Sequence, residues 1–154
     1  MSTQLETRFP SPSATTNFAA ALGARLQPGD VILLEGGIGA GKTHLARSLI
    51  QSLLPQPEDV PSPTFTLVQV YDGPECEIWH ADLYRLTDPN EATELGLEDA
   101  FNDAICLIEW PDRLSDLAPT DALKLELSAS GETSRTMVAC WHDKKWADRL
   151  KGLL

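Results

Sequence analysis

A glycine-rich stretch at residues 36–43 carries the most specific chemical signal in the chain. Its letters, G-G-I-G-A-G-K-T, match the pattern G-x-x-x-x-G-K-[ST] at every fixed position. Glycines let such a loop curl with positive φ, so that backbone N–H groups point at phosphate oxygens. The lysine then reaches the β- and γ-phosphates, and the threonine hydroxyl ligates Mg²⁺. We therefore expect ATP and Mg²⁺ as cofactors, and the absence of a guanine-reading [NT]-K-x-D motif favours adenine. The loop residues expected to contact them are Gly37, Gly39, Ala40, Gly41, Lys42, Thr43 and His44.

Two acidic residues stand where a nucleotide-hydrolysing site needs a carboxylate near its metal. Glu109 follows the apolar run at 105–108, the place of a Walker-B acid. Asp82 lies two residues after His80, and in a strand both side chains point to the same side. For His80 we favour a packed or surface position over a catalytic one. The predicted catalytic residues are Lys42, Asp82 and Glu109, and the predicted metal ligands are Thr43, Glu109 and Asp82. Which carboxylate is the direct ligand stays open.

A short Ser62-Pro63-Thr64 sequence follows a proline-rich connection at residues 55–63. Pro63 stiffens the backbone, and the Thr64 hydroxyl is a candidate sensor of the γ-phosphate or the metal. Ser-Pro-Thr is also a common turn composition, so both interpretations stand.

The elements that must position these residues alternate as an α/β domain requires. An N-cap at Ser13 and an apolar face through Phe18, Leu22 and Leu26 predict a first helix. A buried strand at 31–34, the glycine loop and a helix with an apolar face over 45–53 then follow in order. This order predicts a single domain over residues 1–154 with the P-loop NTPase fold, in three layers around a mixed parallel and antiparallel sheet.

The second half of the chain adds further strands. Two runs flanking Asp72-Gly73 predict a hairpin. The strands expected in this half are 65–71, 77–84, 104–108, 123–128 and 135–141, the last two antiparallel. Short helical turns are expected between 89 and 101, and a C-terminal helix is expected to carry Trp146, Leu150 and Leu153.

The composition limits partners and location. The formal net charge of −11 repels phosphate backbones, which argues against direct, strong nucleic-acid binding. No apolar run approaches the roughly 20 residues of a membrane span, and no signal pattern is present, so we expect a cytoplasmic protein without membrane contact. The three cysteines lack CxxC spacing and are odd in number, which predicts free, inert thiols.

Three further blocks follow the glycine loop in a specific order: S-P-T-F-T-L-V at 62–68, H-A-D-L-Y-R-L at 80–86 and I-E-W-P at 108–111. With the loop they resemble the TsaE (YjeE) family of bacterial P-loop ATPases, from the first predicted helix to about Arg135. The resemblance implies an ATPase accessory subunit for making threonylcarbamoyladenosine on tRNA, acting with the TsaD and TsaB subunits. Those partners would hold the tRNA, which agrees with the acidic composition.

The resemblance also implies roles for single residues. Glu109 and Asp82 match the family's acidic pair near the metal and the attacking water. The implied nucleotide contacts are Trp110 beside the nucleotide, Thr64 in its loop, Arg135 as a late arginine, and Thr15 or Thr16 on the adenine side.

Hydrolysis by the isolated protein is expected to be slow, because no arginine finger is evident near the loop. Arg85 is a candidate in cis, and a partner could supply one in trans. An alternative is a nucleotide-dependent binding switch, with the Thr64 loop or the acidic stretch 88–103 as its docking surface and hydrolysis only as a reset. A small-molecule kinase is disfavoured, because the region after Tyr84 is acidic rather than rich in arginine.

Overall fold

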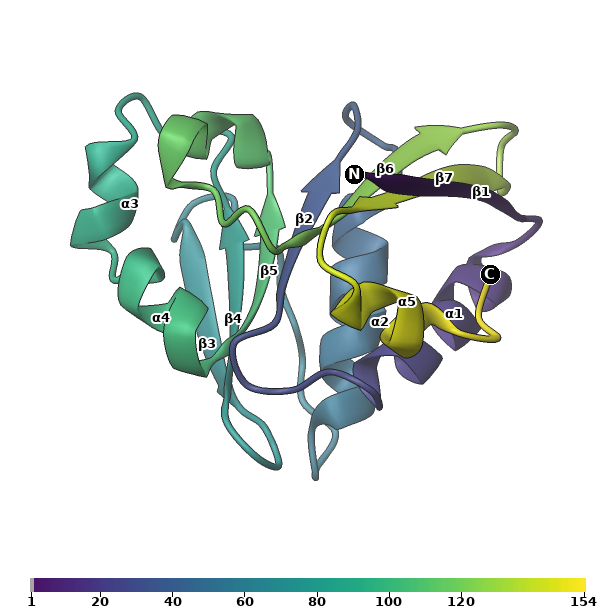
Figure 1. Cartoon of the computed structure of the whole chain (residues 1–154), viewed down its shortest axis with the longest axis horizontal. Coiled ribbons are helices and arrows are strands. Elements are labelled where there is room, and N and C mark those ends of the chain that lie inside the picture. The colour runs from purple at the N-terminus through teal and green to yellow at the C-terminus, as the bar shows by residue number, and fades with distance from the viewer. Residues whose placement is uncertain (1) are drawn as a thin grey trace.

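Two short apolar strands form the centre of the sheet because their side chains are buried on both faces. β2 (Val31–Glu35) and β5 (Ile105–Glu109) pair in parallel. β4 (Glu77–Asp82) pairs in parallel with β5, and β6 (Leu123–Ala129) pairs in parallel with β2. The structure, a computed structural model that describes residues 2–154, has seven strands in the order β1-β7-β6-β2-β5-β4-β3 (Figure 1).

The outer strands of this sheet are antiparallel to their neighbours. β3 (Val68–Asp72) forms a hairpin with β4, as predicted. β7 (Arg135–Trp141) is antiparallel to β6, also as predicted, and β1 (Thr3–Phe9) pairs with β7 at the far edge. No apolar pattern predicted β1, because most of its side chains are exposed at the edge of the sheet. The expected mixed sheet is confirmed.

Helices cover both faces of the sheet, which gives the expected three layers (Figure 1). The helices on one face are α1 (Pro12–Gly23), α2 (Lys42–Leu53) and α5 (Lys145–Leu150). Those on the other face are α3 (Asn90–Glu94), α4 (Leu97–Asp103) and the 3₁₀-helix η1 (Pro111–Leu117).

Successive residues of β2 contribute to two separate hydrophobic cores. Ile32 and Leu34 belong to the core beneath α1, α2 and α5, whereas Val31 and Leu33 belong to the core beneath α3, α4 and η1. This alternation follows from the two-residue period of a strand. It also decides which side chains face α2, and therefore which can reach the glycine loop.

The first helix begins earlier than predicted. Its N-cap is Ser11, not Ser13, and the Ser11 hydroxyl accepts a hydrogen bond from the Ala14 N–H at 3.2 Å. Pro12 occupies the first helical position, where its missing N–H and fixed φ cost nothing. The helix ends at Gly23, so Leu26 packs against the core from the following turn.

The hairpin strands are shorter than predicted, because a turn takes up residues 63–67. The Leu67 N–H donates to the Pro63 carbonyl at 2.7 Å, and Leu67 has a left-handed backbone with φ 67°. β3 therefore starts at Val68, and Phe65 lies 85% exposed on the turn. β4 ends at Asp82 rather than Tyr84.

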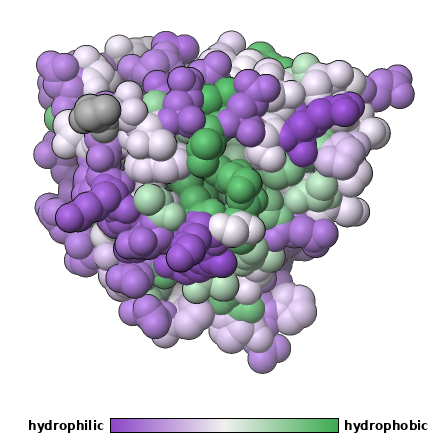
Figure 2. Space-filling view, turned by 45° about the vertical axis from the view of Figure 1, so that its right-hand side comes forward, coloured by the Kyte–Doolittle hydropathy of each residue, from purple (hydrophilic) through white to green (hydrophobic). Residues whose placement is uncertain are grey.

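None of the helices within residues 2–154 combines the length and apolar character needed to traverse a bilayer. On the side that includes β1, hydrophilic residues surround a central hydrophobic area (Figure 2). The three cysteines are free thiols, as predicted, and burial raises the pKa of the Cys106 thiol to about 12.

Candidate functional site

The glycine loop (residues 36–43) joins the carboxyl end of β2 to the first turn of α2. Gly36 packs so closely that a Cβ there would collide with the Leu127 carbonyl oxygen. Gly41, the N-cap of α2, has φ 104°, a conformation that favours glycine. No side chain caps this helix start, so its first N–H groups are available to an anion.

Lys42 lies in the first turn of α2 with its side chain folded back over the loop. It is only 5% exposed, and its ammonium group donates to the carbonyls of Gly36 and Gly37, the latter at 3.1 Å. The same nitrogen stands 3.9 Å from the centre of the Trp110 ring. Burial lowers the pKa of Lys42, and the nearby carboxylates of Glu109 and Asp82 offset part of that effect. The groups in direct contact with this buried charge are therefore neutral, and the two carboxylates lie farther away.

Thr43 and Glu109 meet at the carboxyl ends of the two central strands. The Thr43 hydroxyl donates to Glu109 Oε1 at 2.8 Å, and His80 Nε2 lies 2.7 Å from Glu109 Oε2. His80 is completely buried and Glu109 is 2% exposed. Of the packed and surface positions expected for His80, the structure shows the packed one, and its contact with Glu109 was not anticipated.

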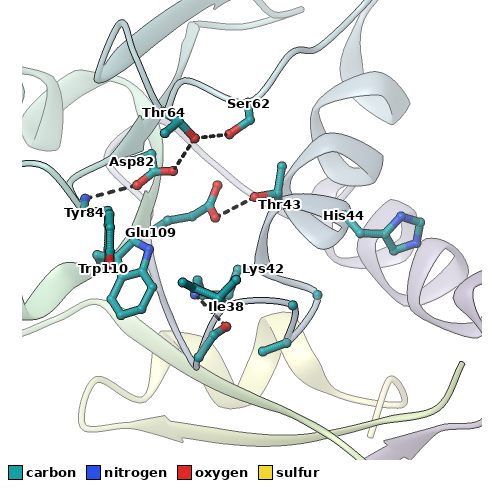
Figure 3. Close-up of a pocket in the computed structure, with 14 residues that line it drawn as sticks. Ile38, Lys42, Thr43, His44, Ser62, Thr64, Asp82, Tyr84, Glu109 and Trp110 are labelled. Carbon is teal, nitrogen blue, oxygen red and sulfur yellow. Dashed lines mark hydrogen bonds between the residues drawn. The ribbon is translucent and has the colours of Figure 1, made fainter. Parts of the chain in front are cut away.

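Asp82 stands beside Glu109, because the two residues are register partners of β4 and β5. Its Oδ2 accepts from the Thr64 hydroxyl at 3.2 Å, and its Oδ1 accepts from the Tyr84 N–H at 3.1 Å. Ser62 Oγ lies 2.8 Å from the Thr64 hydroxyl (Figure 3). The Ser62–Thr64 loop is thus tied to one carboxylate and the glycine loop to the other.

Trp110 forms an aromatic wall beside Lys42. Its backbone is left-handed, with φ 60° and ψ 54°, which turns the chain sharply between β5 and η1. Its ring packs against Tyr84, with ring centres 4.9 Å apart. The Arg113 guanidinium lies 5.8 Å from the centre of the Tyr84 ring.

These groups surround one open pocket of about 440 Å³ (Figure 3). The predicted site residues that line it are Gly37, Gly39, Ala40, Gly41, Lys42, Thr43, His44, Thr64, Asp82, Glu109 and Trp110. The pocket is also lined by Ile38, Ser62 and Tyr84, which were not predicted as contacts. Each of the three lies within two residues of a predicted contact, inside the sequence blocks at 36–43, 62–68 and 80–86.

Two implied contacts lie outside the pocket lining. Thr15 is buried in α1, whereas its neighbour Thr16 lies 3.2 Å from His44 Nε2 and so reaches the edge of the loop. Arg135 packs behind the loop, with its guanidinium against Gly41 and its Nη1 donating to the Ser134 carbonyl at 2.8 Å. Arg85 stacks on Phe65, 5.5 Å from the ring centre, outside the residues that line the pocket.

The donor set at this site consists of oxygens. Over residues 2–154 there is no group of three or more histidine, cysteine or acidic side chains placed to hold a metal alone. A hydroxyl and a carboxylate in contact, Thr43 and Glu109, suit a hard cation that also takes oxygens from phosphate and water.

The amino-acid sequence is similar to one protein family and to several of its members. The family model "Threonylcarbamoyl adenosine biosynthesis protein TsaE" matches residues 9–137. The tRNA threonylcarbamoyladenosine biosynthesis protein TsaE of Rickettsia bellii is 39% identical over 130 residues, covering 84% of this chain and 90% of the relative. The Bacillus subtilis protein of the same name is 34% identical over 133 residues, covering 86% and 82%.

A solved structure shows the same architecture. The crystal structure of Bacillus subtilis YdiB matches with a TM-score of 0.81 and 27% sequence identity, over 99% of this chain and 95% of that one.

Proposed function

Because the chain belongs to the TsaE family of threonylcarbamoyl adenosine biosynthesis proteins, we propose that it binds ATP with Mg²⁺ in the glycine-loop pocket and hydrolyses the ATP. The role in tRNA threonylcarbamoyladenosine biosynthesis follows from the family. The nucleotide chemistry rests on one observation above all, the convergence of Lys42, Thr43 and Glu109 in a single pocket.

Lys42 is the proposed phosphate ligand. Its ammonium group donates hydrogen bonds to two loop carbonyls and lies over the Trp110 ring, and all three partners are neutral. Phosphate oxygens would give this buried charge an anionic partner, so that both the donor and the acceptor of the hydrogen bond would be ionised. The uncapped N–H groups of α2 point to the same place and add the positive end of the helix dipole.

Thr43 and Glu109 are the proposed protein ligands on the metal side. The 2.8 Å contact between them places a hydroxyl and a carboxylate together, and Mg²⁺ in nucleotide sites keeps few protein ligands. When bound, the ion would supply charge neutralisation at the phosphates. Asp82 is tied to Thr64 rather than to Thr43, so we assign it to orienting the attacking water.

The chain is proposed to hydrolyse ATP slowly alone and faster with TsaD and TsaB. Within residues 2–154 the pocket is lined by one lysine and by no arginine, so a charge that stabilises the transferring phosphoryl group is missing. A partner could supply an arginine in trans, a contribution worth about 10³–10⁵ in kcat where it has been measured. Contact with tRNA would be made by those partners.

The binding switch is a second candidate, favoured by the backbone of the Thr64 loop. That loop ends at Leu67 in a left-handed conformation, which a branched aliphatic side chain rarely adopts. Thr64 itself bonds Asp82 in the pocket, so a ligand there would reach the loop directly. A Glu109→Gln protein that binds ATP yet supports many rounds of tRNA modification would favour the switch over hydrolysis.

The test of the main proposal is phosphate release from ATP and Mg²⁺ by the purified protein, with and without TsaD and TsaB. We expect low activity alone, a clear increase with the partners, and loss of both in Lys42→Ala. Full activity without partners would contradict the accessory role. Transfer of phosphate to an added metabolite would reopen the kinase interpretation.

A further inference from the structure

His80 is a buried ionisable residue to which the proposed mechanism so far gives no part. It lies in β4 opposite Leu107 of β5, on the face of the sheet that α2 covers. Its side chain is fully buried, and its Nε2 lies 2.7 Å from Glu109 Oε2. A histidine at this place could simply fill the core, as Leu107 does, so its polar contacts decide what it does.

The two ring nitrogens of His80 have opposite surroundings. Nε2 faces a carboxylate oxygen, which can only accept while Glu109 is ionised. Nδ1 is buried and has no hydrogen-bond partner among residues 2–154. A proton on Nδ1 would be a buried donor with nothing to receive it, which is unfavourable. A proton therefore belongs on Nε2, from which the ring donates to Glu109.

The two oxygens of the Glu109 carboxylate accept hydrogen bonds from different donors. Oε2 accepts from His80 in the core, while Oε1 accepts from the Thr43 hydroxyl at the pocket. With both oxygens held, the carboxylate has little freedom to rotate about its last torsion. Only Oε1 is left on the side where Thr43 stands.

We propose that His80 is a positioning residue, whose Nε2–H fixes the Glu109 carboxylate so that Oε1 alone is presented to the Thr43 side of the pocket. The proposal rests on the proposed function, because it assigns Glu109 a part in Mg²⁺-dependent hydrolysis. It differs from a packing role in needing a donor at one defined atom, not merely a side chain of suitable volume. Hydrogen-bond partners of metal ligands typically contribute about 10- to 100-fold to metal affinity or to activity.

The first test needs neither nucleotide nor metal. Long-range ¹H–¹⁵N spectra of histidine-labelled protein report which ring nitrogen carries the proton, and His80→Gln identifies the His80 signals. We expect the proton on Nε2 and not on Nδ1 in the wild type, and a mixture of tautomers in Glu109→Leu. A ring protonated on Nδ1, or a tautomer unaffected by Glu109→Leu, would overturn the proposal.

The second test separates a donor from a filler by kinetics. His80→Leu keeps the volume and loses the donor, and we expect kcat for ATP hydrolysis to fall about 10- to 100-fold with KM within twofold. His80→Gln can place an amide N–H near the position of Nε2 and should recover most of kcat, whereas the shorter His80→Asn should not. Equal activity in His80→Leu and the wild type would overturn the proposal.

Ile78→Val is the matched control for a loss of packing. Ile78 lies two residues earlier on the same face of β4, is fully buried, and belongs to the core beneath α1 and α2. It should lower the melting temperature without lowering kcat at 20 °C. A fall in kcat for Ile78→Val as large as that for His80→Leu would show that stability alone is being measured, which contradicts a positioning role.

The two hypotheses fail in different ways. If the wild type neither binds nor hydrolyses ATP, the proposed function is wrong. The spectra can still show in that case that His80 is protonated on Nε2 and that this tautomer depends on Glu109. If the wild type hydrolyses ATP and His80→Leu does so equally well, the proposed function stands and the positioning role is wrong.

Discussion

The two ends of β2 hold buried charges in opposite ways. At the amino end, Asp30 is 2% exposed and accepts hydrogen bonds from Arg149, with Nε at 2.6 Å and Nη2 at 3.2 Å. Lys145 lies 3.3 Å away, and the Gln27 N–H donates at 2.8 Å. At the carboxyl end, Lys42 is equally buried, yet its partners are two carbonyls and an aromatic ring.

This difference distinguishes a charge that holds the fold together from a charge that we propose binds a ligand. Asp30 is neutralised by cations of the chain itself, and its ion pairs attach α5 to the start of β2. Lys42 makes no ion pair within 4 Å in residues 2–154, although the carboxylates of Glu109 and Asp82 lie near enough to offset part of the effect of burial on its pKa. A buried charge with no counter-charge in contact is costly, and perturbed groups of this kind cluster at functional sites. Substitutions at the two ends should therefore affect different measurements.

The largest effect is expected for Lys42→Met. Methionine keeps most of the aliphatic stem and removes the charge, so ATP affinity should fall about 100- to 1000-fold, as when one member of a buried charge pair is lost. The free energy of unfolding without ligand should change by less than about 1 kcal/mol, because no ion pair is broken. Calorimetric titration and urea denaturation measure the two quantities. A large loss of stability with affinity intact would reverse the assignment of this end.

The next effect is expected for Glu109→Gln. The amide preserves the shape of the side chain and removes its negative charge, so kcat should fall about 100-fold, as for other preorganised electrostatic groups. ATP affinity should stay within about fivefold, because Lys42 and the loop are unchanged. Single-turnover hydrolysis beside equilibrium binding gives both numbers. Unchanged kcat would remove Glu109 from the proposed mechanism.

At the amino end of β2, Asp30→Asn should act on stability alone. The substitution leaves Arg149 without its counter-charge and Lys145 with Asp121 alone. Because both cations are partly exposed, the expected loss is about 2 kcal/mol, less than for a fully buried pair. For a chain of this length that corresponds to about 4–8 °C in melting temperature. Hydrolysis at 20 °C should match the wild type. Weakened ATP binding in folded Asp30→Asn would show that the two ends are coupled.

The smallest effect is expected for Lys145→Ala. Lys145 is 25% exposed and lies on the rim of the Asp30 network, whereas Arg149 makes the close two-point contact. A rim pair of this kind contributes about 0.2–1 kcal/mol, and less at high salt. Urea denaturation at low and at high salt measures it. A loss as large as that for Asp30→Asn would mean that Lys145, not Arg149, carries the network.

Most of the architecture could be predicted from local patterns. The apolar runs at 31–34 and 105–108 predicted the two central strands, because strands buried on both faces need continuous apolar sequence. The edge strand β1 could not be predicted in this way, because exposed residues carry no such pattern. The turn before β3 was missed because Leu67 adopts a backbone that its side chain gives no reason to expect.

At the site, too, the features made by consecutive residues could be predicted, and those that depend on contacts between distant segments could not. The loop and its lysine could be predicted because consecutive residues make them. The contact of His80 with Glu109 could not, because it depends on the parallel register that places β4 beside β5. The ion pairs of Asp30 with α5 also join distant segments, and no motif around residue 30 predicted them.

The most direct test of the account is a calorimetric titration of the wild-type protein with a non-hydrolysable ATP analogue, in Mg²⁺ and in EDTA. Binding should be tighter with Mg²⁺, and it should be lost in Lys42→Met but retained in Asp30→Asn. No binding by the wild type, or equal binding by wild type and Lys42→Met, would contradict the claim that this pocket is a nucleotide site.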